Sequence, residues 1–196
     1  MIRIALTGPS GAGKGYVGAI LTAKGHPVLD TDALVHEMYE KGDLPQQIGA
    51  MFGKEVLTSS GSVARKKLAE IVFSDPKCLE NLNALVHREV RSAVSLWLMS
   101  KENEGCSVAF VDAPQLFEAK MERDFDCIWA VIAPSDIRLS RICERDGISV
   151  EAARQRMKNQ KSSETYSALA HETLMNDGNN DLEKQVENLL KIILKL

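Results

Sequence analysis

A glycine-rich loop between a short apolar run and an amphipathic run constrains this chain more than any other feature. The loop reads Gly8-Pro9-Ser10-Gly11-Ala12-Gly13-Lys14 and follows the predicted strand Ile2–Thr7. Glycines let consecutive backbone N–H groups turn toward one anion, and the N-terminus of the following helix adds partial positive charge. The pattern predicts a phosphate-binding loop, with Lys14 as the cation for the outer phosphates. The expected nucleotide-binding residues are Gly8, Ser10, Gly11, Ala12, Gly13, Lys14, Gly15 and Tyr16.

The loop departs from its usual form at Gly15, which stands where a Ser or Thr hydroxyl normally binds magnesium. Mg²⁺ keeps several waters readily, so we expect an ion that is held through water, with no direct side-chain ligand. Adenylate kinases also carry Gly-Lys-Gly at this point but continue with Thr, whereas this chain has Tyr16. A decayed, non-catalytic loop is the alternative that Gly15 leaves open.

Composition excludes several classes of function. The net charge is -3 over 196 residues, whereas general nucleic-acid and membrane-surface binders carry a basic excess, so we expect neither kind of partner. The four cysteines are scattered without a C-x-x-C pair, and no apolar run approaches about 18 residues. We therefore expect a cytoplasmic protein with reduced thiols, either a monomer or a weak homo-oligomer.

Short apolar runs alternate with helical stretches along the chain. After residues 2–7, the predicted strands are 27–30, 107–112, 127–132 and 172–175, which implies a five-stranded parallel sheet buried on both faces. Residues 31–106 break this rhythm because their pattern is helical throughout and ends in a long amphipathic stretch from Pro76 to Lys101. We expect a nucleotide-binding core at 1–30 and 107–196, and a helical acceptor-binding insertion at 31–106. Met99 on the long stretch is expected in the core.

A second break, at about 138–164, is rich in charge. Arg138, Arg141 and Arg145 are spaced so that one helix face presents three guanidinium groups, as a lid that closes over phosphates would. The alternative is a solvated face whose arginines pair with Asp136, Glu144 and Asp146, and the spacing alone does not decide between the two.

Carboxylates follow two of the predicted strands. Asp30-Thr31-Asp32 ends the second strand and opens a helix, and Asp112 ends the third. Groups at the carboxyl ends of parallel strands border the ligand crevice, so Asp32 is placed to accept or orient the proton of an attacking hydroxyl. The alternative is that Thr31 or Asp32 only caps the helix. His87 lies among apolar residues of the long helix, where a lone histidine is more often structural.

These pieces together resemble the dephospho-coenzyme A kinase family along nearly the whole chain. The matching segments are Leu6–Lys14, Gly25–Asp32, Phe52–Leu57, Arg65–Phe73, Leu82–His87, Asp112–Glu118, Arg141–Asp146 and Asn176–Gly178. The resemblance implies a P-loop kinase-type three-layer α/β fold with an Arg-rich lid. It implies ATP-dependent phosphorylation of the ribose 3′-hydroxyl of dephospho-coenzyme A, with Mg²⁺ accompanying ATP.

The resemblance also assigns roles. It makes Asp32 the acid at the acceptor hydroxyl, Lys14 the phosphate lysine and Arg141 the lid arginine that reaches the transferring phosphate. The other implied contacts are Arg145 and Asn176 at the nucleotide, Arg65, His87 and Asp112 at the acceptor, and a water-mediated magnesium contact through Asp112. The chain departs from the family pattern at Gly15, Ala64, Arg88 and Gln115.

Two other functions remain as alternatives. A nucleoside monophosphate kinase of the adenylate kinase type explains Gly-Lys-Gly, but a phosphate acceptor needs arginine clamps and not the carboxylates of residues 30–32. A non-catalytic nucleotide-sensing protein explains only Gly15. A GTP-dependent switch is disfavoured because the sequence holds no Asn-Lys-x-Asp motif.

Overall fold

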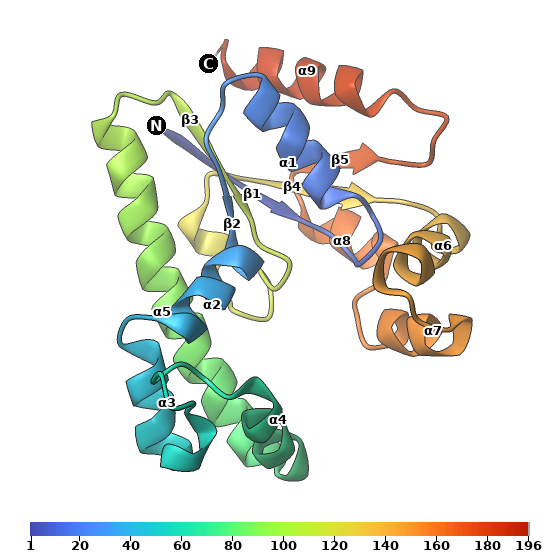
Figure 1. Ribbon diagram of the computed structural model, residues 1–196. Coiled ribbons are helices and arrows are strands. Elements are labelled where there is room, and N and C mark those ends of the chain that lie inside the picture. The colour runs from blue at the N-terminus through green and yellow to red at the C-terminus, as the bar shows by residue number, and fades with distance from the viewer. Residues whose placement is uncertain (196) are drawn as a thin grey trace. The chain divides into compact units, whose positions relative to one another are not determined.

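The computed structural model describes residues 1–195, and its centre is a five-stranded parallel sheet (Figure 1). The strands run in the order β2-β3-β1-β4-β5. Their bounds are Ile2–Thr7 for β1, Val28–Asp30 for β2, Val108–Asp112 for β3, Cys127–Ile132 for β4 and Glu172–Met175 for β5. The five-stranded α/β fold expected from the sequence is confirmed, and each strand lies within one or two residues of its predicted range.

The first strand of the chain lies in the middle of the sheet. Leu6 of β1 pairs in register with Asp112 of β3 on one side and with Trp129 of β4 on the other. The chain therefore leaves the carboxyl end of a central strand, flanked by parallel strands, and enters the glycine-rich loop. This edge is where open α/β sheets bind ligands.

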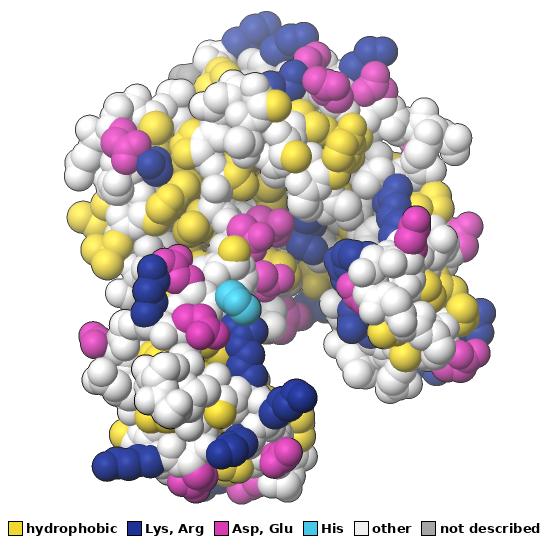
Figure 2. Space-filling view, in the orientation of Figure 1, with side chains coloured by type: hydrophobic (Ala, Val, Ile, Leu, Met, Phe, Trp, Pro, Cys, Tyr) yellow, Lys and Arg dark blue, Asp and Glu magenta, His cyan; other side chains and the backbone are white. Residues whose placement is uncertain are grey.

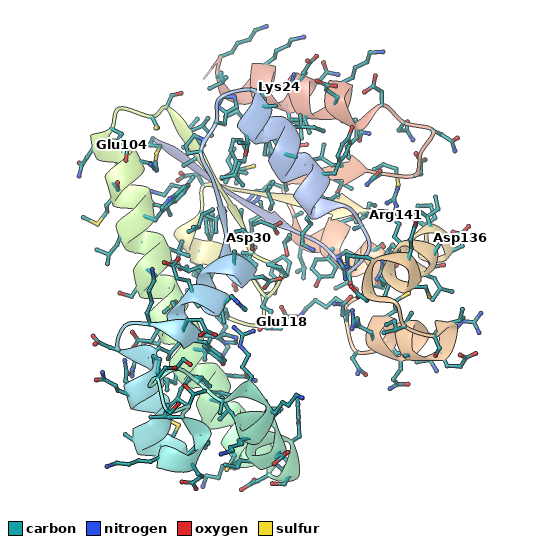
Figure 3. All side chains as sticks on the ribbon, viewed as in Figure 1. Lys24, Asp30, Glu104, Glu118, Asp136 and Arg141 are labelled. Atoms are coloured by element: carbon teal, nitrogen blue, oxygen red, sulfur yellow. The ribbon has the colours of Figure 1, made fainter. Side chains whose placement is uncertain are left out.

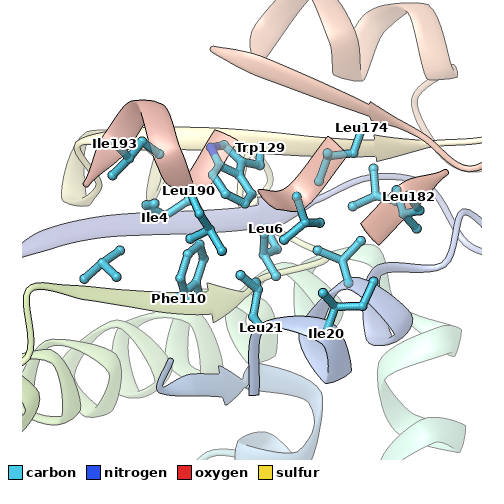
Figure 4. Packing of buried hydrophobic residues seen from close by; sticks show 14 of the residues in the cluster. Ile4, Leu6, Ile20, Leu21, Phe110, Trp129, Leu174, Leu182, Leu190 and Ile193 are labelled. Atoms are coloured by element: carbon cyan, nitrogen blue, oxygen red, sulfur yellow. The ribbon is translucent and has the colours of Figure 1, made fainter. Parts of the chain in front are cut away.

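The sheet and the helices that cover it form one compact unit, which comprises residues 1–29 and 98–196. Helices α1 (Lys14–Ala23) and α9 (Leu182–Ile193) contact each other and pack their apolar faces on the sheet (Figures 1 and 4). In the core that these helices form with the sheet, the rings of Phe110 on β3 and Trp129 on β4 lie with their centroids 5.3 Å apart. A tilted aromatic pair of this kind contributes about 0.5–1.5 kcal/mol beyond its buried area.

Three further helices of this unit follow β4. They are α6 (Ser135–Asp146), α7 (Val150–Lys158) and α8 (Ser163–Leu169). Gly147 ends α6 in the left-handed conformation, while the hydroxyls of Ser149 and Ser162 accept backbone N–H bonds at the starts of α7 and α8. The segment expected to be a lid, at about 138–164, therefore contains most of α6, all of α7 and the start of α8.

The second compact unit, residues 30–97, is helical. It contains α2 (Thr31–Glu40), α3 (Leu44–Phe52), α4 (Arg65–Ser74) and the larger part of α5 (Pro76–Asn103). A short 3-10 helix, Lys54–Val56, follows α3. Its own hydrophobic core is formed by Leu44, Ile48, Val56, Val63, Leu68, Val72, Leu82 and Leu85. The boundary between the units falls inside α5, and Met99, expected in the core, is 54% exposed on that helix.

The surface carries both signs of charge. Figure 2 shows Lys or Arg beside Asp or Glu over α9 and again over α6 and α7. Anion binding must therefore depend on local geometry, since each of these helices mixes cations with carboxylates.

The four cysteines, Cys78, Cys106, Cys127 and Cys143, are free thiols. Within residues 1–195, no helix is long and apolar enough to cross a membrane.

Candidate active site

The phosphate-binding loop, residues 8–15, is shaped by glycines that lie against other segments. Gly11 and Gly13 have φ angles of 78° and 100°, which residues with a side chain rarely adopt. A Cβ atom on Gly13 would lie 2.1 Å from Nδ2 of Asn176, and one on Gly11 would lie 2.6 Å from the carbonyl oxygen of Arg138. The loop therefore needs glycine at both positions for its backbone conformation and for this close packing.

The loop ends at the N-terminus of α1. Gly13 is the N-cap residue, so no side-chain oxygen occupies the first turn, and that turn contains no acidic residue. An uncapped helix N-terminus offers backbone N–H donors and partial positive charge to an anion. The ammonium group of Lys14 donates to the carbonyl oxygen of Gly8 at 3.0 Å, which keeps it folded over the loop. These features favour a phosphate group at this position.

Arg141 and Asn176 form a hydrogen-bonded network with the loop. Arg141 Nη2 donates to Asn176 Oδ1 at 3.2 Å, and Nη1 donates to the carbonyl oxygens of Asn176 at 3.2 Å and Gly11 at 3.3 Å. The Asn176 amide in turn donates through Nδ2 to the carbonyl oxygen of Ala12 at 2.8 Å. Figure 3 shows Arg141 on α6 beside the loop that joins β1 to α1. The structure thus brings together the predicted lid arginine and the predicted nucleotide residue Asn176, which are far apart in the sequence.

The other two arginines of α6 also contact the loop, at Ser10. Arg138 is only 5% exposed, and its Nε donates to the carbonyl oxygen of Ser10 at 2.9 Å. Arg145 Nη2 lies 3.5 Å from Ser10 Oγ, while its Nε and Nη2 donate to the Asp146 carboxylate at 2.7 and 2.9 Å. All three groups, Arg141 and these two, therefore reach the loop. Within residues 1–195, Arg145 is the one of the three with the carboxylate pairing that a solvated face predicts.

Asp146 is held between two cations. Arg145 donates to both oxygens of the Asp146 carboxylate, and Arg156 donates to Oδ2 as well. These two guanidinium groups lower the pKa of Asp146 to about 2. The carboxylate is therefore ionised at neutral pH and orients Arg145 from the end of α6. Asp146 is one of the carboxylates that the alternative of a solvated face expects to pair with these arginines.

Asp112 ends β3, one strand from the loop. It is half-buried and pairs in register with Leu6, which lies two residues before Gly8. Among residues 1–195, no group of three or more His, Cys, Asp or Glu side chains is placed to hold a metal ion. A single carboxylate beside a phosphate-binding loop fits an Mg²⁺ ion that takes most of its ligands from nucleotide phosphates and water.

The helical unit holds Asp32 in the first turn of α2. From the sequence, Thr31 or Asp32 is an alternative cap for this helix, and the structure corrects that alternative. Asp30 is the N-cap, and its Oδ1 accepts the backbone N–H groups of Asp32 at 2.8 Å and Ala33 at 3.1 Å. The extended backbone of Asp30 makes this geometry available, whereas Thr31 and Asp32 already lie in the helix. The Asp32 side chain is exposed and is not the cap.

Two other expected acceptor residues lie in the same unit. The guanidinium group of Arg65 lies 5.2 Å from the centre of the Tyr39 ring, and its Nη2 donates to the carbonyl oxygen of His36 at 3.4 Å. Burial raises the pKa of Tyr39, so its ring remains neutral beneath the cation. His87 is half-buried on α5, and the neighbouring Arg88 is bonded to Glu89 and Gln47.

Sequence reasoning missed Gln160. Its Oε1 accepts the backbone N–H of Ser10 at 2.9 Å, across 150 residues of sequence. A lone glutamine after a charged helix carries no motif, so no sequence signal indicated this contact. Tyr16, which was expected at the nucleotide, is 61% exposed on α1.

The chain is similar to known proteins over nearly its whole length. The family model described as dephospho-CoA kinase matches residues 2–181. A dephospho-CoA kinase of Fusobacterium nucleatum is 36% identical over 97% of this chain and 97% of its own length, and one of Arabidopsis thaliana is 34% identical over 95% and 82%. A protein of Thermus thermophilus with a known crystal structure is 34% identical in sequence to this chain. The two structures align with a TM-score of 0.81, over 99% of this chain and 96% of that one. This chain therefore belongs to the dephospho-CoA kinase family and is a phosphotransferase by that membership.

Proposed function

We propose that this chain transfers the terminal phosphoryl group of ATP to the ribose 3′-hydroxyl of dephospho-coenzyme A, which yields coenzyme A and ADP. The family match supports the choice of acceptor. The observation that carries the proposal is the network of Arg141 and Asn176 on the loop at the start of α1. Because the reaction consumes ATP and supplies coenzyme A to metabolism, we place it in the cytoplasm.

The sheet-containing unit supplies the groups for the nucleotide. The N–H groups of Gly11, Gly13 and the first turn of α1 bind the phosphates, and Lys14 exchanges its bond to Gly8 for a phosphate oxygen. Arg141, already oriented by Asn176, stabilises the negative charge on the transferring phosphoryl group. Arg145, oriented by Asp146, binds the nucleotide.

The helical unit supplies the groups for the acceptor. The Asp32 carboxylate accepts the proton of the 3′-hydroxyl as its oxygen bonds to the γ-phosphorus, and the bond from that phosphorus to the β–γ bridging oxygen breaks to release ADP. The capping role at this helix belongs to Asp30, and Asp32 lies in the first turn that follows it. Arg65 and His87 bind the acceptor, with Arg65 held by Tyr39 beneath it.

Magnesium fits this scheme as an ion carried by ATP. When bound, it neutralises charge on the β- and γ-phosphates. Asp112 would hold it through water, since Gly15 offers no hydroxyl.

The test is ADP release by the purified protein with dephospho-coenzyme A, with AMP and with no acceptor. We expect release that depends on dephospho-coenzyme A, with 3′-phosphorylation of the product shown by mass spectrometry and NMR. Release that depends on AMP would instead make the chain a nucleoside monophosphate kinase, and nucleotide binding without release would make it a sensor. Lys14→Ala should remove most turnover, whereas the matched variant of the exposed Lys184 on α9 should keep it.

A further inference from the structure

Ser10 of the phosphate-binding loop is held through each of its polar groups by residues 138–160. Its carbonyl oxygen accepts from Arg138 Nε at 2.9 Å, and its hydroxyl lies 3.5 Å from Arg145 Nη2. Its N–H group donates to Gln160 Oε1 at 2.9 Å. The two arginines come from α6, but Gln160 comes from the connection between α7 and α8.

The connection that carries Gln160 is fixed on both sides. Before it, the Gln160 N–H donates to the carbonyl oxygen of Met157 at 3.3 Å, which continues the end of α7. After it, Lys161 forms an ion pair with Glu118, and its ammonium group lies 6.0 Å from the centre of the Phe117 ring. The hydroxyl of Ser162 then caps α8. Gln160 therefore extends from an anchored backbone.

The chemistry of this contact fixes the orientation of the carboxamide. A backbone N–H can only donate, so the atom that faces Ser10 must be the carbonyl oxygen of Gln160. The peptide group before Ser10 is then held in one orientation directly ahead of Gly11 and Gly13, whose positive φ angles give the loop its shape. Glycine backbone is conformationally permissive, so a loop rich in glycine depends on such outside contacts to present its N–H groups to phosphate.

We propose that Gln160 is a positioning residue of the phosphate-binding loop. It acts through Ser10, and it orders the loop before the nucleotide arrives. This inference rests on the proposed use of ATP, but it does not depend on which acceptor the protein uses. Its effect belongs to nucleotide binding, since Gln160 contacts the loop through Ser10 and is assigned no contact with the acceptor.

The experiment compares three single variants of the full chain. Gln160→Met keeps the length of the side chain and removes the acceptor, while Gln160→Glu keeps an acceptor of equal reach. Gln155→Met makes the same change at an exposed glutamine of α7 and serves as the control. The readouts are hydrogen exchange at the Ser10 amide without nucleotide and the affinity for a non-hydrolysable ATP analogue, neither of which involves dephospho-coenzyme A.

We expect Gln160→Met to speed Ser10 exchange about tenfold and to weaken analogue binding about 5- to 10-fold, the scale of one lost hydrogen bond. Gln160→Glu should keep the Ser10 amide protected, and Gln155→Met should match the wild type in both readouts. Unchanged exchange and affinity in Gln160→Met would overturn the proposal. Loss of protection in both Gln160 variants would also overturn it, because an acceptor is still present in Gln160→Glu. A failed acceptor assay would leave these two readouts intact, so the two proposals fail separately.

Discussion

Arg141 and Asn176 bind each other through two hydrogen bonds, with Nη2 on the side-chain oxygen and Nη1 on the backbone carbonyl, each at 3.2 Å. The side-chain amide of Asn176 also contacts the loop, where Nδ2 donates to the carbonyl oxygen of Ala12. One asparagine at the end of β5 therefore sets both the position of the arginine and the spacing between that arginine and the loop.

Replacing Asn176 by Ala should lower turnover about 10- to 100-fold, because Arg141 then loses a partner that aims it at the transferring phosphate. Stability should fall by about 1–3 kcal/mol, since two side-chain hydrogen bonds of a half-buried residue are lost. Steady-state kinetics and thermal melting measure the two effects. Asn179→Ala, at an exposed residue of the following turn, is the control. A variant that melts earlier but turns over normally would contradict a positioning role.

Asp32 and Asp30 should separate catalysis from helix capping. Asp32→Asn keeps the shape of the side chain and loses the base, so turnover should fall about 100-fold or more while ATP affinity and melting temperature stay near those of the wild type. Asp30→Ala removes the N-cap oxygen, so it should cost about 1 kcal/mol of stability, and turnover per folded molecule should be retained. Near-normal turnover in Asp32→Asn would remove this residue from the proposed mechanism.

The sequence predicted the three inner strands, β1, β3 and β4, well because each is a short apolar run that is mostly buried within a parallel sheet. It did not predict the cap of α2. Asp30, Thr31 and Asp32 are all residues that cap helices, and only the extended backbone of Asp30 decides among them. The contact between Asn176 and Ala12 spans 164 residues, and such long-range contacts leave no local pattern. The phosphate loop was predictable because its function needs glycines at fixed spacing.

His26 should make stability depend on pH. Burial, with Lys24 nearby, lowers the pKa of His26 from 6.5, and its ring lies 5.9 Å from that of Phe110. The unfolded chain therefore binds this proton more readily than the folded one. The contribution of neutral His26 to stability is complete above pH 6.5 and is lost as the pH falls below that value. Denaturant unfolding of the wild type and of His26→Leu between about pH 5 and pH 7 should show a smaller loss in the variant. Parallel curves for the two proteins would contradict this assignment.

Position 15 should tolerate a serine, whose hydroxyl is missing there in this chain. A Cβ atom built on Gly15 meets nothing within 4 Å, and the residue lies in the first turn of α1, so Ser fits without strain. Gly15→Ser would add a direct oxygen ligand to an ion that is otherwise held by phosphates and water, so turnover should reach half its maximum at a lower Mg²⁺ concentration. Gly15→Ala adds the same Cβ without the oxygen and is the matched control. Both variants should be slightly more stable than the wild type, by up to about 1 kcal/mol, because glycine is a poor helix former. Only the serine variant should change the Mg²⁺ requirement, and equal Mg²⁺ curves for Ser and Ala would show that the ion does not lie beside this position.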